Sequence, residues 1–167
     1  EGHHMETEMT YLIKHNILFA EDGKYYPSRA ITRAEFASFV SRSLKLDDTQ
    51  SYTFVDVPPS YQYAQDISNA AAAGIITGYA QNEFKPNQPV TRQHMAVMLY
   101  RALNYLDIKT TPATLTFRDT HTINKDYHVA VGVNTSLGII KGTPMKDGTY
   151  FYPQNNATRA QASAFIY

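Results

Sequence analysis

The chain has 167 residues, of which 43% are apolar and 18% charged, and this balance is typical of an ordered globular domain rather than a disordered segment. Its 15 basic and 15 acidic side chains cancel, which argues against a broad nucleic-acid-binding surface. The lack of cysteine excludes disulfides and thiolate metal sites, and no apolar run is long enough to predict insertion into a membrane.

The N-terminal part predicts two helices separated by a turn. Residues 1–5 resemble an expression-tag remnant, which we expect to lie outside the folded domain. Apolar residues at helical spacing predict a first helix over residues 7–18. After a polar turn and Tyr26-Pro27, a second helix is expected to begin at Thr32, where Glu35 completes a Thr-x-x-Glu capping box.

The central part repeats this order. Residues 63–73 predict an alanine-rich helix that Gly74 ends in a left-handed conformation. A turn at Gly78 and the segment Phe84-Lys85-Pro86 then lead to a helix that begins at Thr91. His94 stands at the position of the capping-box glutamate in this helix.

The C-terminal part contains the order once more. Residues 127–137 predict a helix before Gly138, and a longer turn that includes Gly142 leads to Tyr152-Pro153. Thr158 is expected to cap the last helix, with Gln161 at the capping-box position.

These segments form an internal repeat, because in each of them a proline precedes an arginine by six residues. The arginines are Arg33, Arg92 and Arg159. We therefore expect three repeats, at residues 6–46, 53–107 and 116–167, of which the first is incomplete at its N-terminal side and the third is short at its C-terminal side. The predicted fold class is all-α, built from three helix-loop-helix repeats.

The ordered motifs resemble the S-layer homology (SLH) domain, which usually contains three tandem copies. The resemblance rests on Gly74-Ile75-Ile76-Thr77-Gly78, on Phe84-x-Pro86 followed by Thr91-Arg92, and on the pentapeptide Ile31-Thr32-Arg33-Ala34-Glu35. It covers nearly the whole chain after residue 5. Tyr63 and Tyr127 stand where the family has a tryptophan, and His94 and Gln161 stand where it has a glutamate.

This resemblance implies a pseudo-threefold, three-pronged spindle whose centre is a bundle of the three helices that begin with Thr-Arg. It also implies a non-catalytic module that anchors proteins to the cell wall or S-layer of a Gram-positive-type bacterium. The implied partner is a pyruvylated secondary cell-wall polysaccharide held in grooves between repeats, by a monomer with internal pseudo-trimer symmetry. The resemblance implies no cofactor, nucleic acid or membrane insertion.

The residues themselves also indicate an anion site. Each repeated arginine follows an N-cap, where the helix dipole already supplies positive potential, so the position disfavours a cation unless an anion is near. A guanidinium and free backbone donors at the helix start would together suit a carboxylate. The alternative is that the arginines pair within the protein with Asp56, Asp119 or the capping-box acid.

Further groove residues are implied by the repeat. A complete groove needs the helix start of one repeat and the glycine turn and prong of another, which adds Asp56, Asp119, Gly78 and Gly142 to the ligand-binding candidates. Tyr63, Tyr79 and Tyr127 are candidates for stacking on a sugar, although half-buried tyrosine in a small core is the commoner case. Because Phe19-Ala20 replaces Thr77-Gly78 in the first repeat, we expect the groove at that turn to bind weakly.

Other classes of function find less support. The histidines show no metal-ligand spacing, and no serine or pair of acids forms a recognisable catalytic arrangement. Self-assembly or oligomerisation within an S-layer is the main alternative to glycan binding. A glycoside hydrolase is a third possibility, which would require a carboxylate pair in one cleft.

Overall fold

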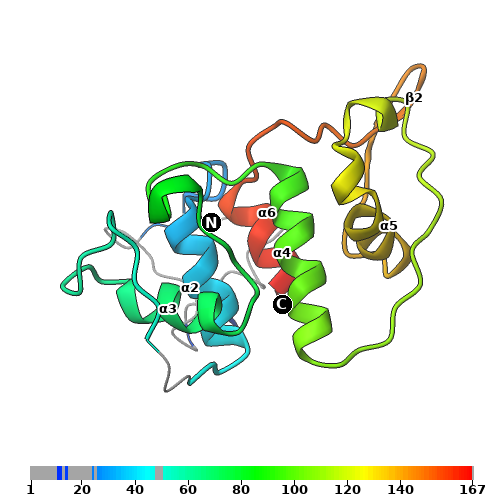
Figure 1. The fold of residues 1–167 in the computed structure, drawn as a ribbon. Helices are drawn as coiled ribbons and strands as arrows, with labels where there is room; N and C mark the ends of the chain where they lie inside the picture. The colour runs from blue at the N-terminus through cyan, green and yellow to red at the C-terminus, as the bar shows by residue number, and fades with distance from the viewer. Residues whose placement is uncertain (1–10, 13, 15–23, 25, 48–50, 167) are drawn as a thin grey trace. The chain divides into compact units, whose positions relative to one another are not determined.

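A computed structural model of the chain describes residues 11–12, 14, 24, 26–47 and 51–166 (Figure 1). These residues form two compact units. The first unit contains the described residues up to Val90 together with those from Ala157 onward, and the second is Thr91–Asn156. Each unit therefore combines segments from different sequence repeats.

The first unit is helical. Helix α2 (Arg33–Ser43) of the first repeat packs against α3 (Ala64–Ala72) of the second repeat, and α6 (Arg159–Ile166) of the third repeat also contacts α2 (Figure 1). A short 3-10 helix, η1 (Ala80–Asn82), follows the Gly78 turn. The apolar faces of α2 and α3 supply much of this unit's buried core, including Phe36, Ala37, Phe39, Val40, Ile67 and Ala70.

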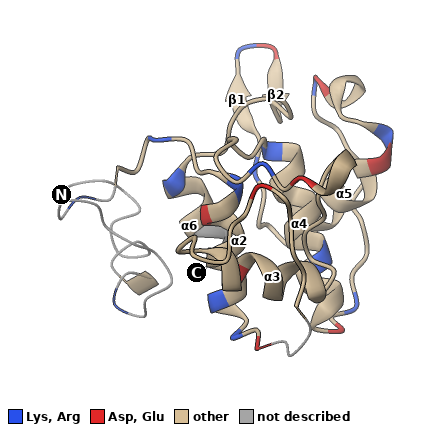
Figure 2. Cartoon of the chain, turned by 60° about the vertical axis from the view of Figure 1, so that its left-hand side comes forward, with Lys and Arg blue, Asp and Glu red and all other residues tan. Residues whose placement is uncertain are grey.

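The second unit pairs helices of the second and third repeats. Helix α4 (Arg92–Tyr105) packs against α5 (His128–Ser136), which the short 3-10 helices η2 (Thr120–Thr122) and η3 (Lys125–Tyr127) precede. Strands β1 (Thr143–Met145) and β2 (Gly148–Tyr150) form an antiparallel hairpin in which Thr143 lies opposite Tyr150 (Figure 2).

The predicted helices over residues 63–73 and 127–137 are confirmed as α3 and α5, each one residue shorter at both ends. Gly74 and Gly138 follow them with φ of 75° and 70°, the left-handed conformation expected of a C-terminal glycine. The helices predicted after Thr32, Thr91 and Thr158 are α2, α4 and α6. The predicted helix over residues 7–18 lies mostly outside the described residues, among which Tyr11, Leu12 and Lys14 are helical.

The structure is mainly helical, which agrees with the predicted all-α class, and it adds the short β1–β2 hairpin. The hairpin occupies the longer turn of the third repeat. The extra residues there let the chain reverse at Met145-Lys146-Asp147-Gly148, and Gly148, with φ of 136°, adopts a backbone conformation that other residues rarely adopt. None of the described helices combines the length and apolar character needed to cross a membrane.

Three backbone hydrogen bonds form a closed ring at the residues that precede the three N-caps. Val90 N–H donates to Ile31 O at 3.0 Å, Ile31 N–H donates to Ala157 O at 3.0 Å, and Ala157 N–H donates to Val90 O at 2.8 Å. All three residues are at most 1% exposed. One residue from each repeat therefore meets at a single buried point.

We predict that Ile31→Ala lowers the free energy of unfolding by about 2 to 5 kcal/mol, because it leaves a cavity beside the ring. Chemical denaturation measures this change. Val55→Ala is the control, since Val55 is 71% exposed and its truncation should change stability by less than about 0.5 kcal/mol. Equal stabilities of the two variants would contradict a central role for the ring.

Candidate functional site

Arg33 begins α2 but is held by the turn of the second repeat. Its side chain is buried, with 4% of the residue exposed. Nε donates to Phe84 O at 2.9 Å, and Nη2 donates to Thr77 O at 3.0 Å. The guanidinium carbon lies 4.7 Å from the centre of the Tyr79 ring and 4.8 Å from that of Phe84. Carbonyl dipoles and aromatic faces thus compensate for the lost hydration of the charge.

Arg92 reproduces this arrangement one repeat further on. Its Nε donates to Phe151 O at 2.8 Å, its Nη2 donates to Lys141 O at 3.4 Å, and its guanidinium carbon lies 5.1 Å from the centre of the Phe151 ring. Lys141 and Phe151 occupy the positions that Thr77 and Phe84 occupy in the second repeat. The two sites therefore share the same pattern of hydrogen bonds to turn carbonyls and the same contact with an aromatic ring.

One donor group of each arginine remains available. In the described part of the chain, Nη1 of Arg33 and Nη1 of Arg92 have no hydrogen-bond partner. Among the described residues, two side-chain atoms are fully buried and lack a hydrogen-bond partner, Ser41 Oγ and Asn134 Oδ1. The two Nη1 atoms also lack a partner but are not among these, so neither Nη1 is fully buried. Each site thus presents a fixed cationic N–H₂ group beside an exposed turn.

Arg159 differs from the other two. It is 2% exposed, and its Nη1 pairs with the carboxylate of Glu35. Glu35 also accepts the Thr32 N–H at 3.3 Å in the capping box and lies 3.6 Å from Arg29 Nη2. Pairing with the capping-box acid, the alternative raised from the sequence, therefore holds for Arg159. Phe19-Ala20, expected in the corresponding groove, lies outside the described residues.

The two motif aspartates cap backbone donors. Asp56 accepts the N–H groups of Phe84 and Lys85 at 2.8 and 2.7 Å, and Asp119 accepts those of Phe151 and Tyr152, both at 2.8 Å. Burial lowers the pKa of the Arg33 guanidinium, while Tyr79 and Asp56 oppose this shift. Burial likewise lowers the pKa of Arg92, and Asp119 opposes the shift. Each aspartate thus balances the charge of its arginine while holding the turn.

The turn residue before each proline has an unusual backbone. Tyr26, Lys85 and Tyr152 have φ of 49°, 60° and 57°, in the left-handed region that side chains other than glycine enter at a cost. In the second and third repeats, the Lys85 and Tyr152 N–H groups donate to Asp56 and Asp119, and these hydrogen bonds stabilise the left-handed conformation. The motif therefore fixes the direction in which Lys85 and Tyr152 project, which the sequence alone did not reveal.

The expectation that the helix starts offer free backbone donors is wrong. In α2, α4 and α6, the first two backbone N–H groups are both bonded to the turn of another repeat. The second N–H donates to the carbonyl of the turn's proline, and the first N–H donates to the carbonyl two residues after that proline. The pairs are Arg33 to Gln88, Ala34 to Pro86, Arg92 to Asn155, Gln93 to Pro153, Arg159 to Arg29 and Ala160 to Pro27, at 2.9 to 3.1 Å. Packing between repeats uses the groups that a ligand would have needed, so the arginine side chains are the remaining donors.

The glycines and tyrosines predicted to line the grooves have structural contacts. A Cβ atom on Gly78 would lie 2.5 Å from the Phe54 ring, and one on Gly142 would lie 2.6 Å from the Phe117 ring. Tyr63 is half-buried against Tyr61, with ring centres 5.6 Å apart, and Tyr127 is half-buried against His94, at 5.5 Å. Glycine is thus required at positions 78 and 142, because any side chain there would overlap the Phe54 or Phe117 ring.

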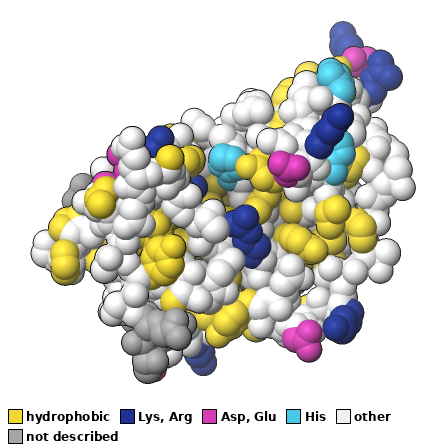
Figure 3. All heavy atoms as spheres, viewed as in Figure 1, with side chains coloured by type: hydrophobic (Ala, Val, Ile, Leu, Met, Phe, Trp, Pro, Cys, Tyr) yellow, Lys and Arg dark blue, Asp and Glu magenta, His cyan; other side chains and the backbone are white. Residues whose placement is uncertain are grey.

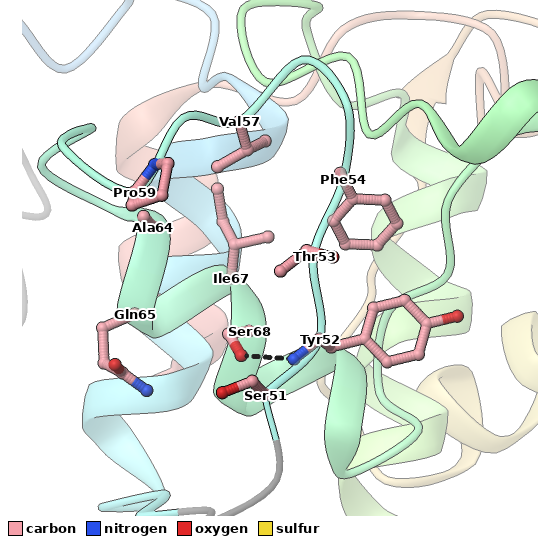
Figure 4. Close-up of a pocket in the computed structure, with 10 residues that line it drawn as sticks. All are labelled: Ser51, Tyr52, Thr53, Phe54, Val57, Pro59, Ala64, Gln65, Ile67 and Ser68. Atoms are coloured by element: carbon pink, nitrogen blue, oxygen red, sulfur yellow. Dashed lines mark hydrogen bonds between the residues drawn. The ribbon is translucent and has the colours of Figure 1, made fainter.

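A separate pocket of about 270 Å³ lies between α3 and residues 51–59 (Figure 4). Tyr52, Phe54 and Ile67 supply apolar walls, and the Tyr52 N–H donates to Ser68 Oγ at 2.9 Å. Its lining contains no charged side chain, so it does not itself offer a partner for an anion.

The described residues also contain no group of three or more histidines and acids that could hold a metal ion.

Comparison with known proteins identifies the family. The S-layer homology domain matches three segments, residues 1–37, 53–96 and 134–163. The chain belongs to the S-layer homology domain family. Its three matched segments correspond to three tandem SLH motifs, as predicted.

Relatives of this SLH chain include enzymes and surface proteins. It is 36% identical to an amylopullulanase of Thermoanaerobacterium thermosulfurigenes over 92% of its length, and 33% identical to S-layer protein sap of Bacillus anthracis over 95%. It is 32% identical to cell surface glycoprotein 1 of Acetivibrio thermocellus over 87%. The aligned region makes up 8%, 19% and 7% of these relatives, respectively. The predicted cell-wall or S-layer location is confirmed, and the SLH region is a surface-anchoring module.

Asp119→Ala should lower the free energy of unfolding by about 2 to 5 kcal/mol, because it leaves the Phe151 and Tyr152 N–H groups without an acceptor. Denaturant titration gives the value. Asp47→Ala is a matched control, since Asp47 is exposed and does not have a left-handed backbone. A loss below about 1 kcal/mol for Asp119→Ala would show that the cap contributes little.

The lowered pKa of Asp56 makes the folding stability depend on pH. Partial burial raises its pKa, but the Phe84 and Lys85 N–H groups lower it more, so the pKa in the folded protein lies below the ordinary value. Its stabilising contribution is therefore present above the unfolded pKa of about 3.9 and is lost as pH falls through the lower folded pKa. The stability difference between the wild type and Asp56→Asn should shrink below about pH 4. A difference independent of pH would refute this assignment.

Proposed function

We propose that this SLH domain attaches its parent protein non-covalently to the cell wall by binding an anionic, pyruvylated secondary cell-wall polysaccharide. The Arg33 and Arg92 sites bind carboxylates of the glycan through Nη1. The observation that carries the proposal is the repetition of a buried arginine whose one unpartnered N–H₂ group lies beside an exposed turn that an aspartate holds.

The geometry of each site favours a carboxylate. A charge-assisted hydrogen bond is worth about 1.5 to 3 kcal/mol, and the arginine is already held in place by two carbonyls, so binding costs little side-chain entropy. At the Arg33 site, the Lys85 ammonium lies 4.4 Å from the centre of the same Tyr79 ring and adds a second cation. Asp56 offsets only part of this charge.

The surrounding surface favours a local site over a general polyanion surface. On the face shown in Figure 3, basic and acidic side chains are interspersed among apolar and uncharged ones. The chain has no net charge when histidine is neutral. Binding therefore depends on the geometry of individual sites rather than on the net charge of the protein.

We extend the proposal to the whole domain. The ring of Ile31, Val90 and Ala157 supports a pseudo-threefold spindle in which the three Thr-Arg helices form a central bundle and the ligand sites lie between prongs. In this arrangement, Arg33 serves the site at the Gly78 turn and Arg92 the site at the Gly142 turn. The site of Arg159 is the weak one, because Glu35 already occupies its guanidinium.

Binding to purified walls tests the function. We expect the protein to sediment with native walls and to stay in solution with walls stripped of secondary polymer. Sedimentation with both preparations would indicate binding to peptidoglycan instead. Concentration-dependent association without any wall material would favour the self-assembly alternative, and release of sugar would favour a glycoside hydrolase.

Lys85→Gln should weaken binding to native walls by about three- to tenfold, since it removes one cation from the Arg33 site at a cost of about 1 kcal/mol. Lys85 is exposed, so this variant should retain the stability of the wild type. Removing the buried Arg33 would instead leave two carbonyls without donors. Lys109→Gln is the control, because it removes the same charge from a side chain that is 93% exposed. Equal affinities of the two variants would argue against the site.

A further inference from the structure

The two sites differ in the residues that surround the same arginine geometry. Lys85 and Tyr152 occupy equivalent left-handed positions between the aromatic residue and the proline. Tyr79, which follows Gly78, is matched by Thr143, which follows Gly142. The second-repeat site therefore combines an arginine with Lys85 and Tyr79, whereas the third-repeat site has Tyr152 and Thr143 at these two positions.

The third-repeat turn instead carries an aromatic pair. The rings of Tyr150 and Tyr152 stack with their centres 5.4 Å apart and an angle of 16° between their planes. Both residues are half-exposed, so the pair is accessible to solvent. Between them in the chain lies Phe151, whose carbonyl accepts the Arg92 Nε donor, so the pair adjoins the Arg92 site.

Two sets of contacts hold the pair in place. The Tyr150 hydroxyl donates to Asp147 Oδ2 at 2.6 Å across the end of the hairpin. The Tyr152 N–H donates to Asp119 Oδ2 at 2.8 Å, which fixes the left-handed backbone. The β1–β2 hairpin, an addition of the third repeat, thus positions Tyr150 beside Tyr152.

We infer that Tyr150 and Tyr152 form a subsite for an uncharged pyranose ring next to the Arg92 site, and that the Arg33 site has no such subsite. The partly exposed rings of this stacked pair, with hydroxyl groups at their edges, match the apolar face and peripheral hydroxyls of a sugar. The inference rests on the proposed glycan binding. It makes the two sites unequal: one recognises mainly the acidic group, and the other also binds a neighbouring neutral sugar.

An NMR titration of the full chain with two defined probes tests the inference. The probes are an uncharged pyranose disaccharide and the same disaccharide bearing a pyruvate ketal. We expect the uncharged probe to shift the ring signals of Tyr150 and Tyr152 but not those of Tyr79. Tyr152→Lys, which copies the second repeat, and Tyr150→Ala should each weaken its binding at least fivefold. Tyr150→Phe keeps the ring but loses the bond to Asp147, so it should weaken binding less than Tyr150→Ala.

The outcomes separate the two claims. If the ketal probe binds at Arg33 in every protein but the tyrosine variants bind the uncharged probe like the wild type, the subsite is refuted and the proposed function stands. If the ketal probe does not bind to the wild type, the proposed function fails. Absence of any binding of the uncharged probe to the wild type also overturns the subsite. Lys occurs in this backbone conformation at position 85, so Tyr152→Lys is expected to fold.

Discussion

The structure depends on an arginine that begins a helix in one repeat and is satisfied by the next repeat. A buried guanidinium is costly unless its donors are paired, and Arg33 and Arg92 find their acceptors in carbonyls that only another repeat provides. This requirement explains why Asp56 and Asp119 must hold the accepting turns and why glycine must stand beside the Phe54 and Phe117 rings. Folding and the proposed recognition thus use the same residue, since two donor atoms hold the turn and the third has no hydrogen-bond partner among the described residues.

A consequence is that a single SLH repeat cannot form a site. The helix start comes from one repeat and the turn from another, and the ring of Ile31, Val90 and Ala157 needs all three. The compact units cross the sequence repeats for the same reason, as α2 packs with α3 and α4 with α5. Differences between repeats then become differences between sites. Lys85, the Tyr150–Tyr152 pair and the Arg159–Glu35 pair give each helix start its own chemistry.

Much of the local structure could be predicted from the sequence, because it depends on short-range rules. The Thr32 capping box, the left-handed Gly74 and Gly138 and the limits of α3 and α5 all follow from residues within one turn of the helix. The partners of the arginines could not be predicted, since Phe84 O lies 51 residues from Arg33 and a carbonyl leaves no signal in side-chain identity. The helix-start donors were misjudged for the same reason. The hairpin was missed because three additional residues in a turn do not by themselves specify strand pairing.

The central claim is that Nη1 of Arg33 and Arg92 binds the acidic group of the wall glycan. The most direct measurement is NMR of the arginine side-chain nitrogens during titration with secondary polymer released from native walls. The account predicts that the Nη signals of Arg33 and Arg92 shift and exchange more slowly with solvent, while those of Arg159, already paired with Glu35, change least. Saturable binding of the polymer that leaves the Arg33 and Arg92 signals unchanged would contradict the account.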